Sequence, residues 1–296
     1  IKLGDNGVNA LVRAKSIKQL KRLTISNNKL THESAVAIAG SKNLQNLQSL
    51  KMYRNKIGDD GILALSKSEN LPNLKSLRLA HNDIGPEGAR FVAESDNMHG
   101  LTALVLSENS LGDKGIKYLA DSKNLTALEI LDLRKNGITN EGVEEFAKSS
   151  NYPNIQKVEL SDNNLTDIGK NALKGFLILN LIRKRVKETD DGMVCDLSNL
   201  GIGDLECDFI ANHDGFSNLT HLYLELNKIT EVGICKLAES KNIESVSLLS
   251  LDRNNIGDKG IKYIIDSENF KNLTHLMIEY NNISDEGIQA IAESEN

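Results

Sequence analysis

Leucines and an asparagine recur along this chain at a fixed interval of 27 residues. Each copy follows the phrase Leu-x-x-Leu-x-Leu-x-x-Asn-x-(Leu/Ile), as in Leu74, Leu77, Leu79, Asn82 and Ile84. A constant period of about 20–50 residues is typical of solenoids, in which each unit stacks on the one before it. The recurring asparagines, which we call the asparagine ladder, are Asn28, Asn55, Asn82, Asn109, Asn136, Asn163, Asn227, Asn254 and Asn281.

The leucine spacing predicts a short strand in every copy. Leu77 and Leu79 are two residues apart, so their side chains point to the same side of a strand, toward a core. Ser76 and Arg78 then point to the opposite side. The turn after the strand buries backbone groups, and an asparagine amide can both donate and accept hydrogen bonds there. We therefore expect the ladder asparagines to hold the turns together.

A helix is predicted after each turn. In the segment 115–120 the apolar residues Ile116, Leu119 and Ala120 form one helical face, and the same columns recur in later copies. Asp, Thr or Ser precedes these helices and acids occupy their first turns, which predicts N-caps and a favourable interaction with the helix dipole. The expected N-cap residues include Asp59, Thr139 and Ser284. Each unit is thus a strand, a turn and a helix.

With these motifs the chain resembles the ribonuclease-inhibitor-like class of leucine-rich repeat proteins over essentially its whole length. The resemblance implies an α/β fold, a right-handed solenoid or horseshoe with parallel strands on the concave face and helices on the convex face. It also implies that the concave face and the adjoining loops bind another protein. The near-identical repeats, rich in Asn, Lys and Ile, are similar to those of bacterial effectors directed at host cells.

The seventh repeat departs from the pattern. Asn163 and Asn227 are 64 residues apart where two repeats would give 54, and Leu200 stands in the ladder position. We expect the irregular insertion to span residues 176–192, either lengthening the preceding helix or forming a hairpin through Asp190-Asp191-Gly192, because Asp-Gly is a turn signal. It is either a tolerated insertion or a docking arm that binds through the basic side chains of Arg183, Lys184, Arg185 and Lys187.

We expect one domain, residues 1–296, made of about ten units of 27 residues. The chain begins inside a repeat and stops before the next strand, without the polar capping units that solenoids generally need. We therefore expect it to be a segment of a longer protein.

Composition indicates a cytoplasmic protein, or one delivered into a host cytosol. No stretch approaches the roughly 20 apolar residues that a membrane helix requires, and no signal peptide is visible. The three cysteines, Cys195, Cys207 and Cys235, are too few for disulfide-bonded caps, and two of them occupy core columns. No motif for nucleotide, metal or serine-hydrolase chemistry is present, so we expect neither an enzyme nor a cofactor. His221 and His275 lie roughly 10 Å apart, two strands along the sheet, which argues against a shared metal.

The outward strand positions and the loops beside them supply the candidate binding residues. They are basic in the first repeats and acidic with aromatic residues in the last. Residues 1–148 hold 21 Lys and Arg against 17 Asp and Glu, while residues 149–296 hold 14 against 24, so the net charges are +4 and −10. The candidates are Arg22, Lys51, Tyr53, Arg54, Arg78, His81, Arg134, His221, Tyr223, Glu225, Asp252, Arg253, His275, Met277, Glu279 and Tyr280.

These positions point to a protein partner. Folding does not require aromatic, histidine or methionine side chains at exposed positions, and aromatic and Arg residues are the usual anchors of protein interfaces. Nucleic acid fits less well, because the chain is acidic overall and lacks an array of stacking rings. The same reasoning predicts that Ala103 and Asp132, in the middle of this face, are exposed.

A second hypothesis is an accessory protein that activates small GTPases, by analogy with ribonuclease-inhibitor-like proteins. Arg54, Arg134 and Arg253, which lie just before ladder asparagines, are then the candidates to supply charge to a phosphoryl-transfer site.

Overall fold

The computed structural model describes residues 3–190, 192–212 and 216–294. The chain divides into two compact units, Ile1–Leu177 and Ile178–Asn296, which we describe separately. The longest helix, α7 (Asp167–Arg185), begins in the first unit and ends in the second.

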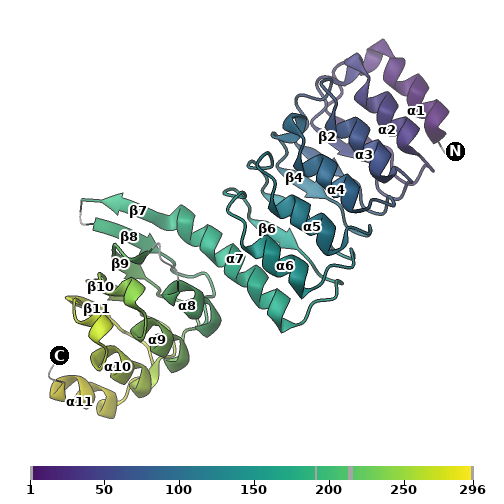
Figure 1. The fold of residues 1–296 in the computed structure, drawn as a ribbon. Coiled ribbons are helices and arrows are strands. Elements are labelled where there is room, and N and C mark those ends of the chain that lie inside the picture. The colour runs from purple at the N-terminus through teal and green to yellow at the C-terminus, as the bar shows by residue number, and fades with distance from the viewer. Residues whose placement is uncertain (1–2, 191, 213–215, 295–296) are drawn as a thin grey trace. The chain divides into compact units, whose positions relative to one another are not determined.

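The first unit is a six-stranded parallel sheet with helices on one face (Figure 1). Its strands follow one another in chain order, and each pairs in register with the strand 27 residues later, so that Leu50 lies beside Leu77 and Leu77 beside Leu104. The strands are β1 (Arg22–Thr24), β2 (Ser49–Lys51), β3 (Ser76–Arg78), β4 (Ala103–Val105), β5 (Ile130–Asp132) and β6 (Lys157–Glu159). The helices are α1 (Gly4–Arg13), α2 (His32–Ala39), α3 (Gly58–Ser66), α4 (Pro86–Ala93), α5 (Gly112–Ala120) and α6 (Asn140–Ala147), with 3-10 turns at Lys15–Ile17, Lys42–Leu44 and Asp96–Met98.

The second unit repeats this plan with a sheet in the order β11-β10-β9-β8-β7. All its strand pairs are parallel except β7 with β8, which is antiparallel. The strands are β7 (Val186–Thr189), β8 (Gly192–Asp196), β9 (Leu219–Tyr223), β10 (Leu248–Ser250) and β11 (His275–Met277). The helices are α8 (Asp204–Ala211), α9 (Glu231–Ala238), α10 (Gly257–Ile265) and α11 (Asp285–Glu293), with 3-10 turns at Lys241–Ile243 and Glu268–Phe270.

The leucine columns form the core between sheet and helices. Leu77 and Leu79 are completely buried, as are the helix residues Ile116 and Leu119, whereas Ser76 and Arg78 are partly exposed. The parallel sheet and the helical layer confirm the expected α/β leucine-rich solenoid. The face of each sheet that carries no helices, which we call the open face, is the surface that the sequence predicted to be concave.

Buried hydrogen bonds of the asparagine ladder link each turn to the turns of adjacent repeats. Asn136 is 2% exposed. Its Nδ2 donates to the carbonyls of Leu106 (2.9 Å) and Leu133 (3.0 Å), and its Oδ1 accepts the Leu111 N–H (3.3 Å). Asn227 makes the same set of contacts in the second unit. Leu200 has no side-chain amide and can supply none of these bonds. Its backbone N–H does donate to Asn227 Oδ1 (3.0 Å).

A second ladder lies at the helix starts and corrects one expectation. Asp59 is not an N-cap: it lies inside α3, and its carboxylate accepts the Gly85 N–H of the next repeat at 2.7 Å. Thr139 is the N-cap of α6, but its hydroxyl donates to Asp113 instead of capping its own helix. Ser284 does cap α11 by accepting the Glu286 N–H. In each of these contacts an aspartate accepts a backbone N–H of the next repeat and so stabilises the packing of neighbouring helices. The aspartates are Asp5, Asp59, Asp113, Asp204 and Asp258.

A third ladder covers the helix ends. The hydroxyl of Ser122 donates to the Ala93 carbonyl at 2.7 Å, and the amide of Asn151 donates to the Ala120 carbonyl at 3.0 Å. These carbonyls belong to the last turn of a helix and have no partner within it. The recurring Ser-x-Asn of this sequence is therefore a capping device supplied by the following repeat.

Glycines in the first turn of the helices allow neighbouring helices to approach closely. A Cβ at Gly142 would lie 2.3 Å from Asp113 Oδ1 and 2.8 Å from Ile116 Cγ2. We expect Gly142→Ala to lower the free energy of unfolding by about 1–2 kcal/mol, because overpacking outweighs the better helix propensity of alanine. Urea unfolding checks this. Gly100→Ala is the control, since its Cβ would meet only the Leu74 carbonyl at 3.8 Å; equal stability of the two variants would contradict the packing argument.

The insertion both lengthens a helix and makes a strand pair. α7 has 19 residues where the other helices have 8 to 10, and Val186–Thr189 then pairs antiparallel with Gly192–Asp196. Asp191, in the expected turn, lies outside the described residues. The extra residues therefore give the second sheet an additional strand, β7, at its edge.

Candidate functional site

The strand register brings the expected binding residues of the second unit together on its open face. His221 of β9, Leu248 of β10 and His275 of β11 are direct neighbours, and so are Tyr223, Ser250 and Met277. Met277 is 37% exposed, whereas Ser250 between Tyr223 and Met277 is buried. Two histidines, a tyrosine and a methionine therefore share one continuous surface.

An acidic row lies directly beyond these strands. Glu225, Asp252 and Glu279 occupy the same position in three successive repeats, two residues before the ladder asparagine. The Glu279 N–H donates to Asp252 Oδ1 at 2.7 Å. Glu225 Oε2 is shielded from solvent and has no hydrogen-bond partner among the described residues. A partner with donor groups would satisfy this row.

The residue immediately before each ladder asparagine has left-handed backbone. The φ angles of Leu226, Arg253 and Tyr280 are 58°, 56° and 54°. This conformation is uncommon for bulky residues, and it recurs because the ladder hydrogen bonds fix the turn. Leu226 is 48% and Tyr280 73% exposed, and the Arg253 guanidinium lies 4.9 Å from the centre of the Tyr280 ring. We call the surface made by His221, Tyr223, Leu226, Arg253, His275, Met277 and Tyr280 the aromatic patch.

A hollow of about 510 Å³ adjoins the aromatic patch at β11. Met277, Glu279 and Tyr280 line it together with Asp252 and Ile288. It combines apolar walls with carboxylates, which suits a partner side chain with an apolar stem and a positive end.

The basic candidates of the first unit gather on β1–β3. Lys51 and Arg78 are direct neighbours across β2 and β3, and Arg22 lies on β1 beside Ser49. Tyr53 is 42% exposed, and Arg54 and His81 have left-handed backbone just before their ladder asparagines. His81 Nδ1 lies 3.8 Å from Glu108 Oε2.

The middle of the open face differs from the prediction. Ala103 and Asp132 were expected to be exposed, but each is only 7% exposed. Arg134 covers Asp132 and forms two bonds to its carboxylate, with Nε 2.9 Å from Oδ1 and Nη2 2.6 Å from Oδ2. Burial alone would raise the pKa of Asp132, but the hydrogen bonds from Arg134 hold it below the ordinary value.

The three arginines of the GTPase hypothesis differ in the contacts of their side chains. Arg134 is held by Asp132, and Arg253 stacks on Tyr280. Arg54 has neither an ion pair nor a ring contact within the described part of the chain. Of the three, Arg54 would need the least rearrangement to contact an incoming group.

The basic residues of the insertion lie around the end of α7 and in β7. Arg183, Lys184 and Lys187 are exposed, while Arg185 Nη1 donates to the Asp196 carbonyl at 2.9 Å. Arg185 therefore links the end of α7 to β8.

Residues 3–190, 192–212 and 216–294 hold no candidate metal site, and two of their three cysteines are buried. No group of three or more His, Cys, Asp and Glu residues is arranged there to hold a metal ion. Cys195 and Cys207 are buried, and burial raises the pKa of Cys195 to about 12, so its reactive thiolate is disfavoured. The same residues include no helix that is both long and apolar enough to cross a membrane.

Sequence reasoning missed three side chains at these surfaces. Leu226 belongs to the aromatic patch, and its signal was an apolar residue in a column that otherwise holds polar residues and a tyrosine. Lys29 and Lys56 directly follow ladder asparagines and line the same hollow as Arg54. They fall outside the strand positions that were considered, and the signal was a lysine at the same place in two consecutive repeats.

Comparison with known proteins agrees with this repeat structure. A family model described as a leucine-rich repeat matches more than half of the chain, in residues 43–66, 70–93, 97–120, 124–147, 217–238, 245–264 and 271–292. No curated protein matches the chain by sequence. Among solved structures the chain is similar to internalin C2 from Listeria monocytogenes str. 4b F2365, with 18% identity, a TM-score of 0.39, and 93% of this chain and 91% of that chain covered. Each matched segment holds one helix of the solenoid, and the chain belongs to the leucine-rich repeat family.

Proposed function

We propose that this chain is a protein-binding module whose second unit holds a protein partner on the aromatic patch. The observation that supports this most directly is the register of β9, β10 and β11, which aligns half-buried His221 and Tyr223 with exposed His275 and Met277 on the open face. Aromatic, Met and Arg residues are enriched at the centres of protein interfaces, where a few of them supply most of the binding energy.

The charge of the second unit specifies the partner further. Residues 178–296 hold 11 Lys and Arg against 21 Asp and Glu, and the acidic row lies next to the patch. Complementary charge orients a partner and accelerates the encounter. We therefore propose a partner with an apolar contact surrounded by Lys or Arg.

We further propose that the protein is of the ribonuclease-inhibitor-like class and acts in the cytosol, as part of a regulator or of a bacterial effector inside a host cell. The helices of 8 to 10 residues in most repeats support this class. The three free cysteines, two of them buried, suit a reducing compartment.

Photocrosslinking tests the proposed binding surface. A photoreactive phenylalanine analogue replaces Tyr280 in the patch or, as a control, Tyr263 on α10, which is 41% exposed. After illumination in cell extract we expect one defined crosslinked species from position 280 and none from position 263. The same species from both positions would refute a site on the open face.

The GTPase hypothesis is the second candidate, and it is favoured by the guanidinium of Arg54, which has no ion pair among the described residues. A turnover assay with a panel of small GTPases would show faster GTP hydrolysis that Arg54→Ala abolishes. No acceleration by the wild-type chain would eliminate this function.

A further inference from the structure

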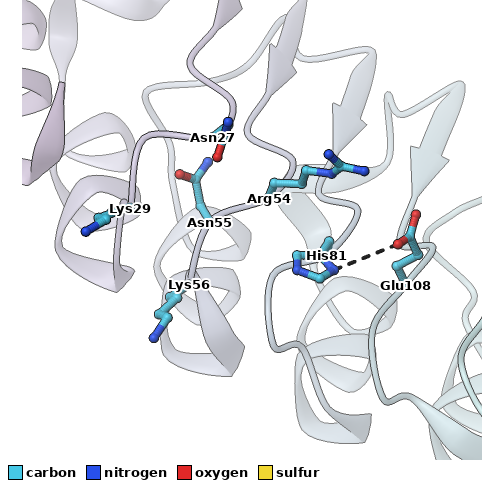
Figure 2. A pocket seen from close by; sticks show the side chains of 7 residues that line it. All are labelled: Asn27, Lys29, Arg54, Asn55, Lys56, His81 and Glu108. Atoms are coloured by element: carbon cyan, nitrogen blue, oxygen red, sulfur yellow. Dashed lines mark ion pairs between the residues drawn. The ribbon is translucent and has the colours of Figure 1, made fainter. Parts of the chain in front are cut away.

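A hollow in the first unit collects positive charge at the carboxyl ends of β1, β2 and β3. Its volume is about 340 Å³, in the range of ligand pockets. Figure 2 shows Asn27 and Asn55 at its centre, the two lysines on one side, and Arg54 with His81 on the other. We call it the basic hollow, and its lining residues are Asn27, Lys29, Arg54, Asn55, Lys56, His81 and Glu108.

The cations of the basic hollow are uncompensated. Lys29, Arg54 and Lys56 make no ion pair within the described residues, and the one carboxylate of the lining, Glu108, lies beside His81. Two other cations of the same sheet, Arg134 and Lys157, are paired with the carboxylates of Asp132 and Glu159 at 2.6 and 2.7 Å. The lining of this hollow therefore carries more positive than negative charge.

Three backbone N–H groups beside the hollow already have hydrogen-bond partners. The N–H groups of Asn27, Arg54 and His81 donate to carbonyls of the following repeat at 2.8–2.9 Å. The amide of Asn55 is occupied by the ladder. A ligand therefore has to be bound by the flexible cationic side chains and by the Asn27 amide, which favours an anion over a neutral group.

We propose that the basic hollow binds a phosphate monoester on a partner protein, that is, a phosphorylated side chain. Cations from two consecutive repeats match the roughly two negative charges of a phosphomonoester better than the single charge of a carboxylate, and an Arg guanidinium binds phosphate with two parallel hydrogen bonds. Lys51 and Arg78 continue the positive surface along the strands for acidic residues that flank the phosphate. That the phosphate belongs to a protein rests on the proposed protein-binding function.

Nucleic acid also carries phosphates but fits the surface less well. Proteins that bind single strands combine positive charge with several aromatic side chains on which bases stack. Near the hollow, the described part of the first unit offers one tyrosine on the open face. It is Tyr53, which follows β2. One ring cannot form such an array.

Fluorescence anisotropy with the full chain tests the proposal. The probe is a short labelled peptide with a single phosphoserine, compared with its unphosphorylated form. We expect the phosphopeptide to bind at least about tenfold more tightly, and Arg54→Gln to remove at least about tenfold of its affinity, a change of about 1.4 kcal/mol. Lys117→Gln on α5 removes one exposed charge elsewhere in the unit and should leave binding unchanged. Inorganic phosphate should compete, and chloride at equal ionic strength should not.

Three results would overturn the proposal. They are equal affinity for the two peptides, equal effects of Arg54→Gln and Lys117→Gln, and displacement of the phosphopeptide by single-stranded RNA at lower concentrations than by inorganic phosphate. Because Tyr223 and Tyr280 lie in the other unit, a variant lacking both rings should still bind the phosphopeptide. Failure of the phosphopeptide with intact crosslinking at position 280 would reject the basic hollow alone.

Discussion

Asn136→Ala should lower the free energy of unfolding of the first unit by about 3 kcal/mol. The substitution leaves the buried N–H of Leu111 without its partner. It also removes one of two side-chain donors from the carbonyls of Leu106 and Leu133, which keep the amides of Asn109 and Asn163. Leaving a buried N–H unsatisfied costs about 1–3 kcal/mol, and each of the two lost hydrogen bonds to the carbonyls contributes on the order of 1 kcal/mol more. Water cannot easily replace the amide, because Asn136 is 2% exposed and packed inside the turn.

Urea unfolding followed by circular dichroism measures this loss. Asn154→Ala is the matched control: Asn154 also donates to a carbonyl of the preceding repeat, that of Thr126 at 3.0 Å, but at an exposed site where water can substitute. We expect the control to stay within about 0.5 kcal/mol of wild type. If the two variants were equally stable, the ladder would not be what fixes the turns, and the regular left-handed residues before each asparagine would need another cause.

Replacing both Tyr223 and Tyr280 with alanine should weaken binding of the crosslinked partner by about 30-fold, or about 2 kcal/mol, the usual threshold for an interface hot spot. Tyr280 is 73% exposed and contacts Arg253, so its removal takes away apolar contact area and frees the guanidinium. The melting temperature should hardly change, because neither ring belongs to the buried core.

Surface plasmon resonance with the partner recovered by crosslinking measures this effect. Tyr263→Ala, which removes a 41% exposed ring from α10, should bind as wild type does. A double variant that binds normally would show that the aromatic patch is not the interface. A double variant with a much lower melting temperature would show instead that these rings stabilise the fold.

The repeat architecture could be predicted from the sequence because its determinants are local. The spacing of Leu77 and Leu79 fixes which side of the strand is buried, and one period of 27 residues fixes the pairing of every strand except β7. The helix columns of Ile116 and Leu119 follow from the same period. Such patterns repeat many times, so irregularity in one copy does not hide them.

The errors come from contacts between side chains of different repeats or of the same face. Asp132 occupies a strand position whose side chain points away from the core. Arg134, two residues later on the same side, covers it. Asp59 has the composition of an N-cap, yet it serves the next repeat because the close approach of the helices places Gly85 beside it. Strand parity and helix-capping rules describe one element at a time and do not include these neighbours.

The candidate sites could be predicted only in part for a related reason. His221 and Met277 were found because they lie on strands, where register is easy to infer. Leu226, Lys29 and Lys56 were missed because their exposure depends on the turn after the strand, whose left-handed residues turn side chains toward solvent. Because the ladder asparagine imposes this turn, the exposure of the residues before and after it can be predicted in other copies.

Hydrogen–deuterium exchange of the full chain, with and without the captured partner, tests the central claim that the open face of the second unit is the binding surface. We expect partner binding to slow exchange in residues 219–227, 248–254 and 275–281 and to leave α9 and α10 unchanged. Slower exchange confined to α9 and α10, with the strands and their turns unaffected, would contradict it.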